Sequence, residues 1–141
     1  MRCLNHFSLL YVSDLVSKAG PNAIGHIARQ SRVNNRRDDI TGLLVFDGSI
    51  FVQMLEGSQA ALGNLLARLH NDPRHENIET LIFDKANSER QFPNWQLGYF
   101  FLDDAPDGIS GLRGTRDAAA LLSFGSLLGH LDLNAAEPSA F

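Results

Sequence analysis

The amino-acid sequence predicts an α+β fold of the ferredoxin-like plan, a β-α-β-β-α-β-β sheet with two helices on one face. Three observations predict it. Strand-like runs alternate with two helical stripes, an Asp-Gly pair separates two of the runs, and one of these runs is apolar on both faces. The last observation requires a cover for the second face of the sheet. A C-terminal helix is the nearest candidate, and a partner subunit is the alternative.

The first strand and the first helix are expected in the first quarter of the chain. In residues 4–13, a period of two places Phe7, Leu9, Tyr11 and Ser13 on one face. A helix then begins near Pro21, and its core-facing stripe ends at Asn35.

A hairpin is expected next. Residues 40–46 and 49–56 suit two antiparallel strands, and Asp47-Gly48 between them predicts a tight turn with two positive φ angles. On the second strand, Phe51 and Leu55 flank Gln53 on one face, while the other face carries Ile50, Val52 and Met54. Neither face suits contact with water.

The remainder of the chain, from Ser58 onward, predicts two more strands and two helices. Ser58 can cap a helix that ends before Asp72-Pro73 and whose stripe consists of Leu62, Leu65, Leu66 and Leu69. Strands follow near residues 80–83 and 95–101. A third helix over residues 115–131 carries Ala118, Leu121, Leu122, Leu128 and Leu131, and residues 134–141 are expected to be frayed.

Composition and charge limit the classes of function. The 141 residues, 44% of them hydrophobic, suit one core, and the single Cys3 excludes an internal disulfide and a Cys-rich zinc site. No apolar run reaches membrane-spanning length, so we expect a cytoplasmic protein without a membrane partner. The net charge of −4 argues against a nucleic-acid partner.

Three polar residues stand out on core-facing positions, and each has an ordinary structural interpretation. Gln53 suits a buried amide bonded to backbone, Tyr11 a core tyrosine, and Asn35 a residue that ends a helix. Their convergence is more informative, because they would present a phenol and two carboxamides to one apolar slot between the helices.

Six motifs resemble the BLUF family of blue-light receptors in order and spacing, from about residue 4 to residue 99. The element Phe-x-Gln-x-Leu-Glu-Gly after Ile-Thr-Gly is highly specific. The motifs are Tyr11-Val12-Ser13, Asn34-Asn35, Ile40-Thr41-Gly42-Leu43-Leu44, Phe51-Val52-Gln53-Met54-Leu55-Glu56-Gly57, Asp72-Pro73-Arg74-His75 and Arg90-x-Phe92-x-x-Trp95.

The resemblance implies a flavin between the two helices, usually FAD, with FMN or riboflavin possible. Tyr11 matches the donor of an electron and a proton, Gln53 the amide that bridges phenol and flavin, and Asn35 the residue that holds the ring edge. The implied photoactive residues are Tyr11, Gln53 and Trp95. The implied cofactor-binding residues are Tyr11, Ser13, Ile27, Asn34, Asn35, Gln53, Leu55, Arg68, Arg74 and His75.

The implied function is blue-light reception, in which Gln53 rearranges to give a red-shifted signalling state that changes protein–protein contacts. Residues 1–102 would form the flavin-binding domain, and residues 103–141 a helical extension and tail. The resemblance therefore implies a homo-oligomer and a separate effector protein. Leu97 stands where the family usually has methionine, which puts the signalling route and the dark-recovery rate in question.

Two other classes of function remain open, a flavin-dependent redox enzyme and a pigment-free ferredoxin-like interaction module. We expect no enzyme, because the sequence has no Gly-x-Gly-x-x-Gly after a strand and its cysteine has no redox partner. We also expect no metal site, because the five histidines are scattered.

Overall fold

The computed structural model describes residues 6–20, 22–86, 89–92, 94–100, 109–128 and 131–132, and for residues 95–100, 110 and 131–132 it describes the backbone alone. Eleven elements occur in these ranges. In chain order they are β1 (Phe7–Leu15), η1 (Ser17–Ala19), α1 (Ala23–Arg37), β2 (Thr41–Phe46), β3 (Ile50–Gly57), α2 (Gln59–His70), β4 (His75–Lys85), β5 (Trp95–Phe100), η3 (Ile109–Leu112), α3 (Asp117–Leu128) and β6 (Leu131–Asp132).

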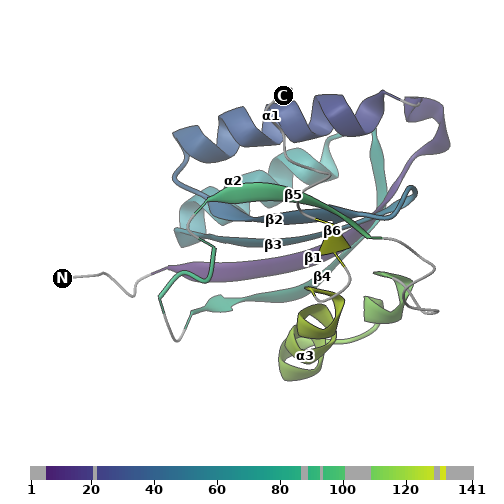
Figure 1. The fold of residues 1–141 in the computed structure, drawn as a ribbon. Coiled ribbons are helices and arrows are strands. Elements are labelled where there is room, and N and C mark those ends of the chain that lie inside the picture. The colour runs from purple at the N-terminus through teal and green to yellow at the C-terminus, as the bar shows by residue number, and fades with distance from the viewer. Residues whose placement is uncertain are drawn as a thin grey trace.

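One sheet organises the molecule, with the strand order β4-β1-β3-β2-β5-β6 (Figure 1). β1 pairs antiparallel with both β3 and β4, and β2 pairs antiparallel with β3 and parallel with β5. This arrangement confirms the predicted ferredoxin-like α+β plan. The short β6, which pairs antiparallel with β5, is an addition that the sequence analysis did not anticipate.

The inner face of the sheet lies under α1 and α2 (Figure 1). Leu9 of β1, Leu44 of β2 and Leu55 of β3 are buried there together with Ile27 of α1 and Leu62 of α2. The predicted alternation along the first strand is confirmed, and the strand continues to Leu15, two residues beyond the predicted end; residues 4 and 5 of the predicted range 4–13 lie outside the described residues.

The outer face of the sheet is covered by the C-terminal segment, as predicted. Ile109 and Leu112 of η3 and Phe124 and Leu127 of α3 form a second buried cluster with outward-facing strand residues such as Val52. Figure 1 shows α3 on the opposite side of the sheet from α1 and α2. Because both faces of β3 are thereby covered, its apolar residues are buried on both sides.

The face of the third helix was predicted wrongly. The buried residues of α3 are Ala120, Phe124 and Leu127, whereas Leu122 is 76% exposed and Leu121 is 45% exposed. The helix also ends at Leu128, and Leu131 begins β6. Apolar residues occur around most of this helix, so periodicity did not identify the buried stripe.

The β2–β3 turn differs from the prediction by one residue. The Asp47 amide donates to the Ile50 carbonyl, so Gly48 and Ser49 occupy the centre of the turn. Of these two only Gly48 has a positive φ, at 107°, as in a type II′ turn. The Asp47 carboxylate accepts from the Ser49 and Ile50 amides at 2.9 and 2.8 Å, which stabilises this alternative.

The fourth strand is longer than predicted, since β4 starts at His75 and not near residue 80. It is an edge strand with a polar first half, and its pairing with β1 contains two register shifts. The first half of β4 shows no alternation of apolar and polar residues, because its residues are mostly polar and a bulge interrupts the period of two.

Two further expectations concern the ends of the chain and membranes. Residues 134–141, which were expected to be frayed, lie outside the described residues. In the part of the chain that the structure describes, no helix has the length and apolar character needed to span a bilayer.

Candidate functional site

A cavity of about 510 Å³ lies between α1, α2 and the inner face of the sheet. This volume falls within the range of roughly 300–1,000 Å³ that is usual for small-molecule sites. Most of the predicted cofactor-binding residues line it, namely Tyr11, Ile27, Asn34, Asn35, Gln53, Arg68, Arg74 and His75. The other lining residues are Gln30, Ser31, Leu65, Leu69, Asp72 and Pro73.

The floor of the cavity holds a phenol and an amide from neighbouring strands. Tyr11 of β1 and Gln53 of β3 are directly paired across the sheet. The Tyr11 hydroxyl donates to Oε1 of Gln53 at 2.5 Å, at the short end of the range for such bonds. Both residues are 3% exposed.

The Tyr11 phenol stays protonated over the physiological pH range. Burial, reinforced by the negative charge of Asp72, raises the pKa of Tyr11 well above its ordinary value of 10.0. The hydroxyl is therefore a proton donor that Gln53 holds in a fixed direction.

Two buried amide nitrogens at the cavity have no hydrogen-bond partner. Nε2 of Gln53 and Nδ2 of Asn35 are both buried and unpaired, although each can donate two hydrogen bonds. A buried donor without a partner costs about 1–3 kcal/mol. Because both residues line the cavity, a ligand with hydrogen-bond acceptors would remove this cost.

Charged side chains occupy the α2–β4 side of the cavity. Nε and Nη2 of Arg74 donate to the Asp72 carboxylate at 2.9 and 2.7 Å. Nη2 of Arg74 also donates to Oε1 of Gln30 at 2.7 Å and so connects the turn to α1. Arg68 lies 3.5 Å from Asp38. Burial opposes the ionisation of Asp72, but its hydrogen bonds with Arg74 prevail and lower its pKa.

His75 forms part of the cavity wall and is held from behind. Its Nδ1 lies 3.0 Å from the Ser13 hydroxyl, and its ring packs against Phe51 with centroids 4.9 Å apart. Burial lowers the pKa of His75 below 6.5 against the opposing charge of Asp72, so the ring is neutral at pH 7. Ser13 is not among the lining residues itself, and it reaches the cavity only through its contact with His75.

Leu55 and Trp95 stand apart from the other predicted residues. Leu55 is fully buried in the inner core and does not line the cavity. The backbone register places Trp95 beside Gly42 and Leu97 beside Leu44, which is itself the neighbour of Gln53. The side chains of Trp95 and Leu97 lie outside the described part of the chain.

Sequence reasoning did not assign Gln30 and Asp72 to the site, although both line the cavity. Gln30 is an exposed helix residue next to the apolar stripe, and Asp72 marks a helix end within the motif Asp72-Pro73-Arg74-His75, so neither pattern indicates a cavity position. Among the residues that the structure describes, no group of three His, Cys, Asp or Glu side chains is placed to hold a metal ion.

Comparison with known proteins agrees with this geometry. The family model "Sensors of blue-light using FAD" matches residues 7–98. The blue light- and temperature-regulated antirepressor BluF of Escherichia coli is 32% identical over 83 residues, 59% of this chain and 21% of that protein. The photoactivated adenylate cyclase subunit beta of Euglena gracilis is 33% identical over 64% of this chain and 10% of its own length.

Solved structures show the same fold. BlrB, described as a BLUF protein in its dark state, superposes with a TM-score of 0.70 at 31% identity and covers 88% of this chain and 95% of its own. BlrP1 of Klebsiella pneumoniae with FMN gives a TM-score of 0.65 at 26% identity, over 87% of this chain and 34% of its own.

The matched part of the chain thus spans about a fifth of the length of BluF, about a tenth of the length of the cyclase subunit, and nearly all of BlrB. The family match covers more than half of the 141 residues and includes the strands that carry Tyr11 and Gln53. The chain belongs to the BLUF family, the sensors of blue light that use FAD.

Proposed function

We propose that this protein is a blue-light receptor that binds one flavin non-covalently in the cavity and reports illumination by rearranging the hydrogen bond between Tyr11 and Gln53. The observation that carries the proposal is the 2.5 Å bond from a buried phenol to a buried amide whose other end has no partner. The protein acts as a sensor, in which every group would return to its original oxidation state and only the hydrogen bonds would change.

The residues around the cavity fit a flavin. The ring system of a flavin has two carbonyl oxygens and unprotonated ring nitrogens at one end, which suit the unpaired donors of Asn35 and Gln53. Its flat apolar part suits the walls formed by Ile27, Leu65 and Leu69. Asn34, which lines the cavity beside Asn35, would contact the same polar end of the ring.

We propose FAD as the bound flavin, with FMN or riboflavin as the alternatives. The family description names FAD, whereas BlrP1 holds FMN in its structure. Arg74 and His75 would lie toward the flavin side chain, and Arg68 would lie near the polar side of the flavin. Both arginines already have carboxylate partners, so they would meet a ligand as parts of ion pairs and not as free cations.

A flavin held in this cavity would supply an oxidant that is generated by blue light and takes an electron and a proton from a neighbouring donor. Tyr11 is that donor. Loss of an electron would make its phenol strongly acidic, and the proton would pass to Oε1 of Gln53 along the existing hydrogen bond while Nε2 of Gln53 releases a proton toward the flavin. When an electron and a proton have returned to Tyr11, Gln53 would be left turned over or tautomerised, with its donor and acceptor ends exchanged. The exchanged hydrogen bond gives the small red shift in absorbance.

Replacing Gln53 with leucine tests this role directly. Q53L keeps the approximate volume but removes both amide groups, so flavin should remain bound while the light-induced red shift disappears. Gln59→Leu, the same change at an exposed position at the start of α2, should keep the shift. A red shift retained in Q53L would overturn the assignment.

We also propose that the flavin-binding domain comprises residues 1–102, that residues 103–141 form an extension, and that the signal leaves through a homo-oligomer and a separate effector. Two observations support this output. The relatives are described by name as an antirepressor regulated by blue light and as an adenylate cyclase subunit activated by light. In addition, α3 exposes Leu121 and Leu122 to solvent. Light scattering at high concentration tests the oligomer, and a monomer in both darkness and light would contradict it.

A further inference from the structure

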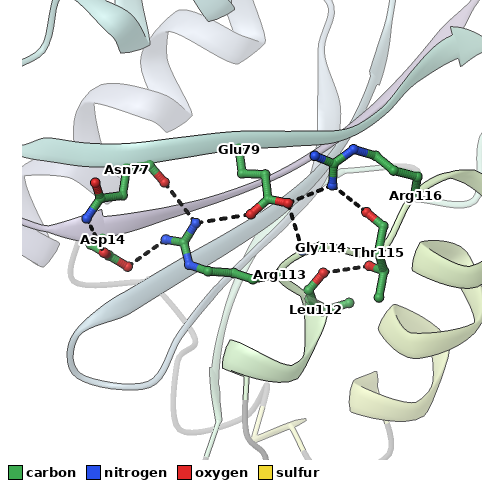
Figure 2. Close-up of polar contacts among 8 residues, drawn as sticks. All are labelled: Asp14, Asn77, Glu79, Leu112, Arg113, Gly114, Thr115 and Arg116. Atoms are coloured by element: carbon green, nitrogen blue, oxygen red, sulfur yellow. Dashed lines mark hydrogen bonds and ion pairs between the residues drawn. The ribbon is translucent and has the colours of Figure 1, made fainter.

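A network of ion pairs joins the C-terminal segment to the edge of the sheet (Figure 2). Nη2 of Arg113 donates to Oδ1 of Asp14 at 2.7 Å. Nη1 of the same residue donates to the Asn77 carbonyl at 2.9 Å and contacts Oε1 of Glu79 at 3.4 Å. A single guanidinium in the turn before α3 thus contacts both β1 and β4.

The same carboxylates have further partners. Oε2 of Glu79 accepts from the Gly114 amide at 2.7 Å and from Nη1 of Arg116 at 2.6 Å. Nδ2 of Asn77 donates to Oδ2 of Asp14 at 2.8 Å. We call this set, made of Asp14, Asn77, Glu79, Arg113, Gly114 and Arg116, the latch.

The latch is built on a bulge in β4. Asn77 has a φ of 53°, in the left-handed region, and the pairing of β1 with β4 shifts register between Val12 and Asp14. In a regular strand His75 and Glu79 would face the same side. The bulge reverses this, so His75 lines the inner cavity while Glu79 contacts the outer C-terminal segment.

The bulge also lies directly behind the cavity wall. Ser13 holds Nδ1 of His75, and the next residue, Asp14, is held by Arg113 and Asn77. Asp14 and His75 belong to the two β1–β4 pairs that follow the bulge along β1, Asp14–Glu76 and Leu15–His75. A displacement of Ser13 or His75 would be passed to the latch, because Ser13 directly precedes Asp14 on β1 and His75 lies two residues before Asn77 on β4.

We infer that this bulge is a relay, by which the state of the flavin cavity sets how tightly the latch holds η3 and α3 on the outer face of the sheet. The inference rests on the proposed flavin site. Filling the cavity fixes His75 and with it the bulge, and the latch then holds α3. The light-driven rearrangement of Tyr11 and Gln53 disturbs β1 three residues before Asp14 and loosens the latch.

Hydrogen–deuterium exchange of the α3 amides tests the relay in flavin-free protein, in flavin-loaded protein in the dark and under illumination. A coupling free energy of the size typical of allosteric proteins predicts that flavin binding slows the exchange of the α3 amides about fivefold or more. Illumination should then bring the exchange rate part of the way back to that of the flavin-free protein. Arg113→Gln should give fast exchange in all three states while the red shift of its bound flavin persists.

Two other variants sharpen the result. Arg116→Gln removes a contact to Glu79 but leaves Asp14 and Asn77 with Arg113, so it should keep the dependence on flavin. Asp14→Asn is the second disrupting variant if Arg113→Gln does not fold. Exchange of α3 that is independent of flavin loading in the wild-type protein, or full dependence in Arg113→Gln, would overturn the relay. An absent red shift would refute the proposed photochemistry instead, and the comparison of loaded with flavin-free protein would still decide the relay.

Discussion

At the scale of single residues, the site depends on groups whose protonation is set by burial. Tyr11 keeps its proton because burial and Asp72 raise its pKa, and His75 loses its proton because burial lowers its pKa. Each group therefore has one defined role at neutral pH, with Tyr11 as a donor to Gln53 and His75 as a neutral partner of Ser13.

Tyr11→Phe should abolish photoswitching without unfolding the protein. The ring volume is kept, but Gln53 loses the donor to its Oε1. We expect flavin to stay bound, the red shift to be lost, and the free energy of unfolding to fall by about 1 kcal/mol. Absorbance spectroscopy and urea denaturation check these outcomes, and a red shift of wild-type size would exclude Tyr11 as the donor.

His75 should make stability fall in mildly acidic solution. Its pKa is lowered in the folded state, so the unfolded chain binds a proton more readily, and stability declines as the pH drops below 6.5. The free energy of unfolding, measured by denaturation at several pH values below 6.5, should depend less on pH in His75→Gln. It should keep the wild-type dependence on pH in His26→Gln, which changes an exposed histidine.

At the scale of elements, one glycine decides how closely β2 can approach β3. Gly42 has a φ of 156°, and a Cβ at this position would meet the Met54 carbonyl oxygen at 2.0 Å. Gly42 also pairs with Leu55 on one side and with Trp95 of β5 on the other. The join between β2, β3 and β5 thus depends on the absence of a side chain.

Gly42→Ala should destabilise the protein by about 3 kcal/mol or more, because backbone atoms must move to admit the methyl group. Gly63→Ala is the matched control, since nothing lies within 4 Å of its added Cβ in α2. It should stabilise the helix by about 0.5–1 kcal/mol. Thermal unfolding of both variants measures this difference, and equal melting temperatures would contradict the account.

Sequence patterns predicted elements well where one face differs from the other. The alternation in β1 and the leucine stripe of α2 each identified a buried face, and Ser58 caps α2 as expected. Patterns failed where that contrast is missing. The helix α3 is apolar on most sides, and β4 changes its facing at Asn77, which no local periodicity reveals.

At the scale of the whole molecule, the sheet separates the cavity from the C-terminal segment. The inner core with α1 and α2 surrounds the cavity, and the outer core lies under η3 and α3. The motifs around Tyr11, Asn35 and Gln53 allowed most of the cavity to be predicted from the sequence. The latch was not predicted, because its residues come from three distant segments and no pattern within any one of them indicates the others.

Acid should weaken the attachment of the C-terminal segment. Hydrogen bonds from Asn77 and Arg113 outweigh burial and lower the pKa of Asp14 below 3.8, and Arg116 with Gly114 lowers that of Glu79 below 4.5. Their contribution to stability is present above pH 4.5 and is lost as the pH falls through the lowered values. A hydrophobic dye should bind the outer face of the sheet once the C-terminal segment detaches, and as the pH is lowered this binding should begin at a higher pH in Arg113→Gln than in the wild-type protein. Identical profiles of dye binding against pH in the two proteins would count against the latch.

The absorbance spectrum of the purified protein in darkness, directly after blue illumination and during recovery tests the central claim most directly. The account predicts a flavin spectrum that shifts slightly to the red without bleaching and then returns to its dark form. Bleaching to a reduced flavin would contradict it in favour of a redox enzyme. A colourless protein that takes up no added flavin would leave only an interaction module.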